Sequence, residues 1–345
     1  MKKIDFLFPN KPPYGELVEI RLGIFWFPIE LPMMGPDFVN CYILEDGNEI
    51  VIFDTGVNLG DTKNIWARVL ERYFPKKKIK YIVVTHHHPD HIGLAGWLSE
   101  EYEAPIYCTR TAFTMAKMLS LDVQERVTLN TKNFWKRAGM AKQILDEKLK
   151  SRPFNFGDGV YPLNHGFIRL KQSDQLNING IKWRVEVGNG HAPEHATFWS
   201  DDLDLIIAGD QILPGISSNL GVYPTEPEAD TVGDWIETCE RFLISANDEQ
   251  IVLPGHGLPF SGLPKRLNQL IDNHAGALKR IRDSLNQSPK TAADLFSAIF
   301  KRDINKREYL LALHEAVGHV NHLYKLGEAD REVREDGALI YRLTK

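Results

Sequence analysis

The sequence predicts a protein of the α+β class. Short β-strand patterns fill residues 16–53 and resume at 167–187, and single strands recur at 205–208 and 250–253. Helical patterns lie between and after these regions, the longest at 263–286. Groups of strands with helices inserted among them or appended to them are typical of this class.

Size and composition limit the functions to consider. The 345 residues suffice for one large domain or two ordinary ones, and 43% hydrophobic with 25% charged residues is typical of a globular protein. A net charge of -5 gives no electrostatic reason to expect nucleic acid as partner. The three cysteines are widely spaced, which fits a reducing compartment without disulfides. Neither a signal peptide nor an apolar run of ~20 residues is evident, so we expect a cytoplasmic protein with no membrane partner.

The N-terminal third predicts strands joined by tight turns. Val18–Leu22 alternates apolar and polar residues, and an Asp46-Gly47 turn separates the next two strands. Helical spacing begins near Asp61 or Thr62, either of which can cap a helix. The expected strands are 18–22, 41–44, 50–53, 79–84 and 105–108, and the expected helices are 61–73 and 94–100.

Residues 111–150 predict a helical insertion. Large apolar residues recur at helical intervals, and a break near 128–130 divides the segment into two helices. Two interpretations are open. The helices pack on a core, or they cover the functional site and shape an apolar substrate pocket to which Met118 and Trp135 contribute.

The C-terminal part predicts two further groups of elements. Strands are expected at 167–170, 175–178, 181–187, 205–208 and 250–253, and helices at 229–243 and 263–286. After Ser288-Pro289, helices at 292–300 and 308–326 precede a hairpin near 333–341, which is the order of a small winged helix. We therefore place a catalytic domain at 1–286 and a winged-helix-like domain at 287–345. Residues 285–345 hold ten Lys/Arg and nine Asp/Glu, so this tail is expected to pack on the main domain or form a homodimer rather than bind nucleic acid.

The segment Thr85-His86-His87-His88-Pro89-Asp90-His91 carries the main chemical signal. It follows a β-branched apolar strand, where residues 86 and 88 point to the same face. Pro89 ends the strand, and the turn brings Asp90 and His91 to the same place. Imidazole nitrogens with one carboxylate are ligands for zinc, iron or manganese. The alternative is a histidine-rich loop without a metal.

Three more candidate ligands each follow a predicted strand. His191 lies in Gly188-Asn189-Gly190-His191, Asp210 follows Gly209, and His256 lies between Gly255 and Gly257. Glycine beside each ligand lets the backbone turn sharply near a crowded centre. One Gly-His pair is weak evidence, but three such positions at strand ends after the 86–91 segment form a strong pattern.

These motifs resemble those of the metallo-β-lactamase-fold hydrolases, especially the glyoxalase II-like branch. The matching motifs, in the family's order, are Asp54-Thr55-Gly56, His86-x-His88-x-Asp90-His91, Gly190-His191, Gly209-Asp210 and Gly255-His256. The resemblance covers roughly residues 16–275 and implies a four-layer αββα sandwich. The winged-helix-like tail resembles a subfamily that includes an RNA-cleaving member.

The resemblance implies a site for two divalent metal ions, with zinc expected and iron or manganese as alternatives. One ion would be held by His86, His88 and His191, and the other by Asp90, His91 and His256. The carboxylate of Asp210 would bridge both. Asp54 matches a supporting position that orients ligand histidines.

The remaining histidines are assigned smaller roles. His195 either touches substrate in the cleft or is a turn residue, and His87 is expected to be structural. The others match no motif and are expected to be ordinary core or surface residues; they are His165, His274, His314, His319 and His322.

The expected chemistry is hydrolysis by a hydroxide that the dinuclear centre activates, with Asp90 orienting the nucleophile or moving its proton. The substrate would be a small ester, thioester or lactone with an apolar portion. Three alternatives stay open: a phosphodiesterase or ribonuclease, a mononuclear-iron sulfur oxygenase, and a non-catalytic metal protein.

Overall fold

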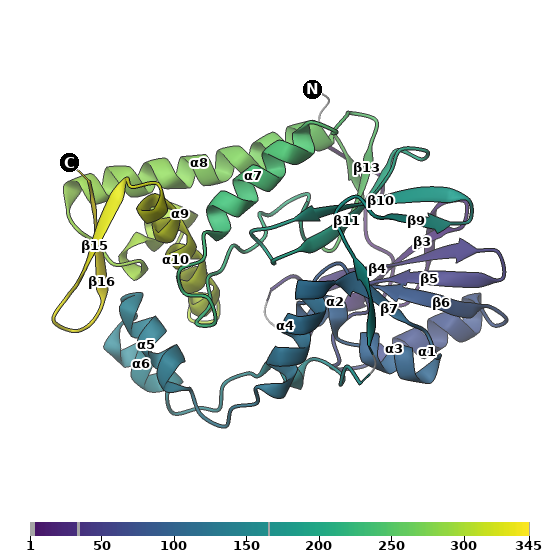
Figure 1. Cartoon of the computed structure of the whole chain (residues 1–345), viewed down its shortest axis with the longest axis horizontal. Coiled ribbons are helices and arrows are strands. Elements are labelled where there is room, and N and C mark those ends of the chain that lie inside the picture. Colours follow the sequence, from purple (N-terminus) through teal and green to yellow (C-terminus); the bar gives the residue numbers. More distant parts are fainter. Residues whose placement is uncertain (1–3, 33–34, 165, 345) are drawn as a thin grey trace. The chain divides into compact units, whose positions relative to one another are not determined.

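The computed structural model of the chain describes residues 4–32, 35–164 and 166–344 (Figure 1). His165 lies outside the described residues. The chain divides into two compact units, each assembled from separate segments. Unit 1 comprises Met1–Val123, Asn155–Ser218 and Ser245–Arg266, and unit 2 comprises Gln124–Phe154, Asn219–Ile244 and Leu267–Lys345.

Two seven-stranded sheets form the centre of unit 1 (Figure 1). The N-terminal sheet has the order β2-β3-β4-β5-β6-β7-β8, and the C-terminal sheet has the order β1-β14-β13-β12-β11-β10-β9. The strands of the first are Val18–Arg21, Ile24–Glu30, Phe38–Asp46, Glu49–Phe53, Lys78–Val83, Ile106–Thr109 and Phe167–Leu170. Those of the second, from β1 to β9 in that order, are Asp5–Phe6, Phe260–Ser261, Ile251–Pro254, Leu205–Gly209, His195–Ser200, Ile181–Gly188 and Gln175–Ile178.

The two sheets pack face to face through one apolar cluster. Phe53 of β5 meets Phe198 of β11 edge to face, with ring centroids 5.0 Å apart, and lies 6.4 Å from the ring of Trp183 in β10. All three side chains are fully buried, and each such burial stabilises the fold by ~1.5–3 kcal/mol. The predicted α+β class, with two sheets and helices, is confirmed.

Three helices of unit 1 pack their apolar residues into a second cluster with the other face of the N-terminal sheet. They are α1 (Thr62–Tyr73), α3 (Ala95–Glu101) and α4 (Arg110–Leu121). Asp61 stands at the N-cap position of α1, but its carboxylate binds Asn64 and Arg68 rather than a backbone N–H of the helix. The short helix α2 (Pro89–Ile92) begins at Pro89, directly after the loop that carries His86 and His88.

Residues 111–150 differ from the predicted pair of helices, because the structure has three. Helix α4 belongs to unit 1, whereas α5 (Leu129–Arg137) and α6 (Lys142–Lys148) belong to unit 2. Gly139 separates α5 from α6 with φ of +86°, a left-handed conformation that interrupts a right-handed helix. The prediction of two helices in this segment was therefore wrong in helix number.

Unit 2 contains most of the C-terminal helices and a hairpin. Its elements after α6 are α7 (Thr231–Leu243), most of α8 (Leu263–Gln287), the 3₁₀ turn η2 (Ala293–Leu295), α9 (Phe296–Phe300), α10 (Tyr309–Lys325), β15 (Ala329–Val333) and β16 (Leu339–Leu343). The predicted order of two helices and a hairpin after residue 287 is found. The units nevertheless do not divide after residue 286, because α8 continues through that position and earlier segments pack with the tail.

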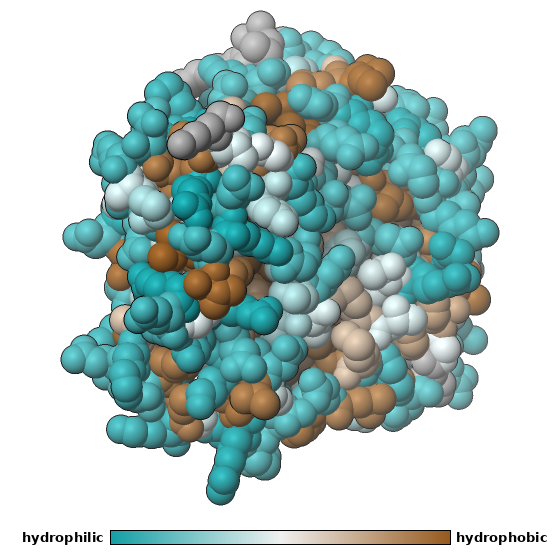
Figure 2. All heavy atoms as spheres, turned by 60° about the vertical axis from the view of Figure 1, so that its left-hand side comes forward, coloured by the Kyte–Doolittle hydropathy of each residue, from teal (hydrophilic) through white to brown (hydrophobic). Residues whose placement is uncertain are grey.

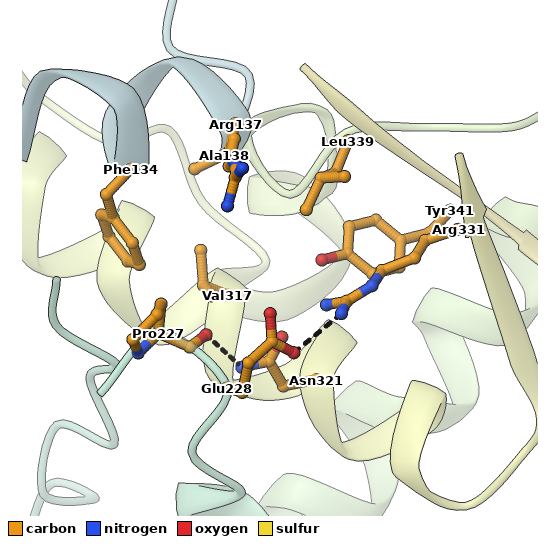
Figure 3. A pocket seen from close by; sticks show the side chains of 10 residues that line it. All are labelled: Phe134, Arg137, Ala138, Pro227, Glu228, Val317, Asn321, Arg331, Leu339 and Tyr341. Carbon is orange, nitrogen blue, oxygen red and sulfur yellow. Dashed lines mark hydrogen bonds and ion pairs between the residues drawn. The ribbon is translucent and has the colours of Figure 1, made fainter. Parts of the chain in front are cut away.

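A pocket in unit 2 lies among α5, α10, the hairpin and the segment before α7 (Figure 3). Asn321 of α10 donates to the carbonyl of Pro227, and Arg331 of β15 forms a 2.8 Å ion pair with Glu228. These contacts connect residues 219–244 with residues 267–345 beside the pocket.

The face shown in Figure 2 is mostly hydrophilic, with hydrophobic residues in small separate groups. Among the described residues, no helix combines the length and apolar character that a membrane span requires.

Candidate metal centre

The seven predicted ligands all follow strands of unit 1. The loop after β6 and the short helix α2 carry His86, His88, Asp90 and His91; the turn after β10 carries His191; Asp210 and His256 follow β12 and β13. Strands β12 and β13 are parallel neighbours, with Gly209 opposite Pro254. The residues that follow them therefore lie side by side at the C-terminal ends of these strands. The structure brings all seven side chains together in three overlapping groups.

The first group consists of His86, His88 and His191, whose ligand atoms lie within 4.8 Å of one another. His86 Nε2 lies 3.0 Å from His88 Nδ1. On its other side, His86 Nδ1 lies 3.0 Å from Thr85 Oγ1, which itself donates to Asp54. The hydroxyl can therefore accept only from a protonated Nδ1, which leaves the lone pair of Nε2 directed into the group.

The second group consists of Asp90, His91 and His256. Asp90 Oδ2 lies 3.2 Å from His256 Nε2 and 3.7 Å from His91 Nε2. The opposite nitrogen of His256, Nδ1, lies 2.6 Å from the backbone carbonyl oxygen of Phe38 and must be protonated to bond it. Hydrogen bonds of this kind fix the tautomer that a metal-binding histidine needs.

Asp210 lies between the two groups. Its Oδ1 is 3.3 Å from His91 Nε2, and its Oδ2 is 3.2 Å from His256 Nε2 and 3.5 Å from His191 Nε2. One carboxylate thus faces histidines of both groups, the arrangement that a bridging ligand requires.

Asp54 supports the loop from the end of β5. Its two oxygens accept from the Thr85 backbone N–H and hydroxyl, each at 2.8 Å, and Oδ2 lies 2.7 Å from His91 Nδ1. Asp54 has a left-handed backbone, with φ of +56°, that a non-glycine residue seldom adopts. Because His91 Nδ1 is engaged by this carboxylate, its Nε2 faces the centre.

The electrostatics of the centre separate the histidines into two kinds. Burial, reinforced by His91, lowers the pKa of His86 well below its usual value. Burial acts to lower the pKa of His256, but the carboxylates of Asp210 and Asp90 together outweigh it and raise that pKa to about 10. Carboxylates likewise overcome burial at His91, with Asp210 foremost, and raise its pKa well above normal.

The donor atoms fit divalent metal ions. Within the described residues, His91 Nε2 and Asp210 Oδ1 are both buried and make no hydrogen bond although they face each other. Buried polar atoms without hydrogen bonds are rare, and an ion between them would satisfy both. Five imidazoles with two carboxylates form a nitrogen–oxygen set that suits zinc, iron or manganese.

One supporting residue, Asn40, escaped the sequence analysis. Asn40, fully buried in β4, donates to the carbonyls of Pro254 and Gly257 at 2.8 Å and so holds both sides of His256. Its Oδ1 accepts from the indole of Trp26. A lone asparagine in an apolar strand is the only sequence signal for this role.

Gly255 is required for space rather than for backbone freedom. A Cβ at this position would lie 2.1 Å from Asp210 Oδ1 and 2.8 Å from His91 Cε1. Gly255→Ala should therefore displace Asp210 and lower activity by at least about 100-fold, since a misplacement of ~1 Å costs that much. Gly215→Ala is the matched control, because nothing lies within 4 Å of its added Cβ. Equal kcat/KM for the two variants would contradict this role of Gly255.

The other predicted site residues do not belong to the three ligand groups. His195 is fully buried at the start of β11, where its Nε2 accepts from the Asp210 backbone N–H at 3.1 Å and its ring stacks on His86. His87 is buried against Phe156. Met118 lies on α4 with 48% of its surface exposed, whereas Trp135 is buried in unit 2.

Two family models match the chain. The model described as "Metallo-beta-lactamase superfamily" matches residues 34–256, which include every side chain of the candidate centre. The chain belongs to the metallo-β-lactamase superfamily. A second model, "Metallo-beta-lactamase-like, C-terminal domain", matches residues 278–344. The resemblance predicted from the motifs is confirmed at the level of the superfamily, and this membership supports a metal-dependent hydrolase.

Individual proteins agree with this assignment. The "Probable metallo-hydrolase YqjP" of Bacillus subtilis is 24% identical over 293 residues, which cover 81% of this chain and 85% of that protein. The crystal structure of a "Beta-lactamase domain protein" from Burkholderia ambifaria has a TM-score of 0.89 and 29% identity, and the match covers 99% of this chain and 98% of that one. The "Transcription termination factor FttA" of Methanosarcina mazei is 31% identical over 108 residues, 31% of this chain but 17% of that protein.

Proposed function

We propose that the chain is a dinuclear metal-dependent hydrolase that cleaves a small ester, thioester or lactone, in the manner of the glyoxalase II-like branch. The observation that carries this proposal is the position of Asp210, which faces His91, His191 and His256 at 3.2–3.5 Å. Two ions would be held by His86, His88 and His191 on one side and by Asp90, His91 and His256 on the other, with Asp210 shared.

Bound divalent ions supply Lewis acidity and lower the pKa of water from ~15.7 toward ~7. The chain's own residues hold and orient the reactants. Asp90 has 18% of its side chain exposed, more than Asp210 at 8%, so it is the carboxylate that can accept a proton from a nucleophilic water. Asp54, Thr85 and the carbonyl of Phe38 keep the imidazoles in the required tautomers.

A phosphodiesterase or ribonuclease is the second candidate. The local similarity to a transcription termination factor favours it and weakens the expectation that nucleic acid is not a partner. Against it stands the balanced charge of the tail, with ten Lys/Arg and nine Asp/Glu in residues 285–345.

The proposal also keeps the prediction that the C-terminal tail is winged-helix-like and the prediction that the protein forms a homodimer.

A substrate panel separates the two candidates. The purified full chain, loaded with zinc, is assayed against thioesters, aryl esters, lactones, bis-aryl phosphodiesters and a single-stranded RNA. We expect kcat/KM for at least one carbonyl substrate to exceed that for every phosphodiester by about 100-fold or more, a difference of ~2.7 kcal/mol in transition-state stabilisation. Faster cleavage of RNA, or tight salt-sensitive binding to it, would favour the second candidate instead.

Metal analysis of the same sample separates the mononuclear-iron alternative. A hydrolase with the proposed centre should need two ions there and stay active with zinc, which has no redox chemistry. Activity that depends on one iron ion and on oxygen would reject the hydrolase.

An apolar substrate pocket remains part of the proposal, with Met118 of unit 1 as its predicted contributor. Met118→Ala should change the ratio of kcat/KM for long and short acyl chains by about tenfold, because one methylene in an apolar pocket is worth ~1–3 kcal/mol. Leu121→Ala, at another exposed position on α4, is the control. Trp135→Ala should lower the free energy of unfolding by about 3–5 kcal/mol, because the indole is buried and bonds His314. An unchanged ratio in the Met118 variant would remove that residue from the pocket.

A further inference from the structure

We infer that His274, Glu315 and His319 form an additional metal-binding site in unit 2, which takes a single divalent ion of the zinc type. These residues belong to none of the superfamily motifs, and they share no residue with the dinuclear centre. The site is therefore independent of the proposed hydrolase activity.

The site is built on two helices. Glu315 and His319 are separated by four residues on α10, so they lie on the same face of the helix one turn apart. His274 comes from α8, and both helix segments belong to unit 2. The three ligand atoms lie within 4.8 Å of one another, and both imidazoles are almost completely buried. Two histidines and a glutamate are a known ligand set for zinc, with a fourth position left for water.

The distance between the two imidazoles suits a shared ion. His274 Nδ1 lies 3.3 Å from His319 Nε2. Zinc–nitrogen bonds of ~2.0–2.1 Å in a tetrahedron place two ligand nitrogens about 3.3–3.4 Å apart. Without an ion, one proton shared between the two nitrogens satisfies the same geometry. A metal would replace that proton with little movement of either ring.

The surroundings orient two of the three ligands as a metal site requires. His319 Nδ1 lies 2.9 Å from the carbonyl oxygen of Glu315 and donates to it, so Nε2 is left as the acceptor nitrogen. Glu315 Oε2 accepts from Asn219 Nδ2 at 2.8 Å, which fixes the carboxylate. Metal-binding histidines usually donate their other ring N–H to a backbone carbonyl, a carboxylate or water, and ligating carboxylates are themselves hydrogen-bonded.

The test measures zinc in the full chain after the dinuclear centre has been dismantled. In the His86→Gln/His256→Gln background, the protein is loaded with ZnCl₂, desalted and analysed for metal content and thermal unfolding. We expect one zinc equivalent that disappears when His274→Gln or Glu315→Gln is added and that stays when His314→Gln is added. His314 is the matched control because it is another buried histidine of α10 outside the cluster.

The background protein alone can overturn the inference, because its unit 2 is unaltered. Zinc should raise its Tm, and a chelator should reverse the rise. A background protein that retains no zinc and shows no shift in Tm would show that the cluster is only a hydrogen-bonded pair of histidines beside a glutamate. Equal zinc content with and without His274→Gln would overturn it as well.

Discussion

Asp210→Ala should lower kcat/KM by more than any substitution of a residue that acts through another group. Asp210 faces His91 with one oxygen and both His191 and His256 with the other, so alanine would remove the shared ligand of both proposed ions. Substitutions of residues that support metal ligands typically cost about 10–100-fold. The loss in Asp210→Ala should exceed that range, and metal analysis should show fewer bound ions.

His195→Ala should lower kcat/KM by less than Asp210→Ala does. His195 Nε2 accepts from the Asp210 backbone N–H, so its loss should shift Asp210 without removing a ligand. We expect a decrease within the ~10–100-fold range and an unchanged metal content. Asp201→Ala is the control for removal of an aspartate, since that side chain is 79% exposed. Equal activity of the Asp210 and His195 variants would reject the bridging role.

The ligand positions were predictable because each is marked by local sequence. Strand patterns followed by a glycine and a histidine or aspartate place the side chain at a strand end, and the parallel pairing of β12 with β13 then brings Asp210 and His256 together. Asn40 carries no such mark. Its role depends on β4 lying beside the turn of residues 254–257, a contact between segments more than 200 residues apart.

Four strands, β1, β3, β11 and β14, were not predicted from the sequence. The two longer ones, β3 and β11, illustrate different physical reasons. Strand β3 contains Pro28, which argues against an interior strand. In the structure β2 pairs only as far as Trp26 of β3, so Pro28 lies where β3 has a strand neighbour on one side alone. Strand β11 shows no alternation of apolar and polar residues because all six of its residues are buried.

Local sequence patterns could not predict which segments of the chain form unit 2. It joins residues 124–154, 219–244 and 267–345, and nothing in the period of a helix states which distant helix it will contact. For the same reason His274 and His319 were read as ordinary histidines. Only the packing of α8 with α10 places their nitrogens 3.3 Å apart.

The second large loss of activity is expected on substitution of Asp54. This residue is not a predicted metal ligand, but it contacts the ligand His91. In Asp54→Asn, the amide oxygen can still accept from the Thr85 backbone N–H. The amide nitrogen, however, cannot accept from the Thr85 hydroxyl or from His91 Nδ1 as the carboxylate oxygen does. His91 would then favour the tautomer with its proton on Nε2, the nitrogen that faces Asp210 at 3.3 Å and that must be unprotonated to bind a metal.

We expect Asp54→Asn to weaken zinc affinity, and with it kcat/KM, by about 10–100-fold, as is usual when the partner of a ligand histidine is lost. Chelator competition measures the affinity, and ¹⁵N–¹H spectra of histidine side chains report the tautomer of His91, which a merely structural role of Asp54 would leave unchanged. Asp61→Asn is the matched control, because that carboxylate is 55% exposed and binds only surface partners. If Asp54→Asn keeps both the zinc affinity and the His91 tautomer of the unaltered chain, the hydrogen bond from His91 Nδ1 to Asp54 does not position the ligand.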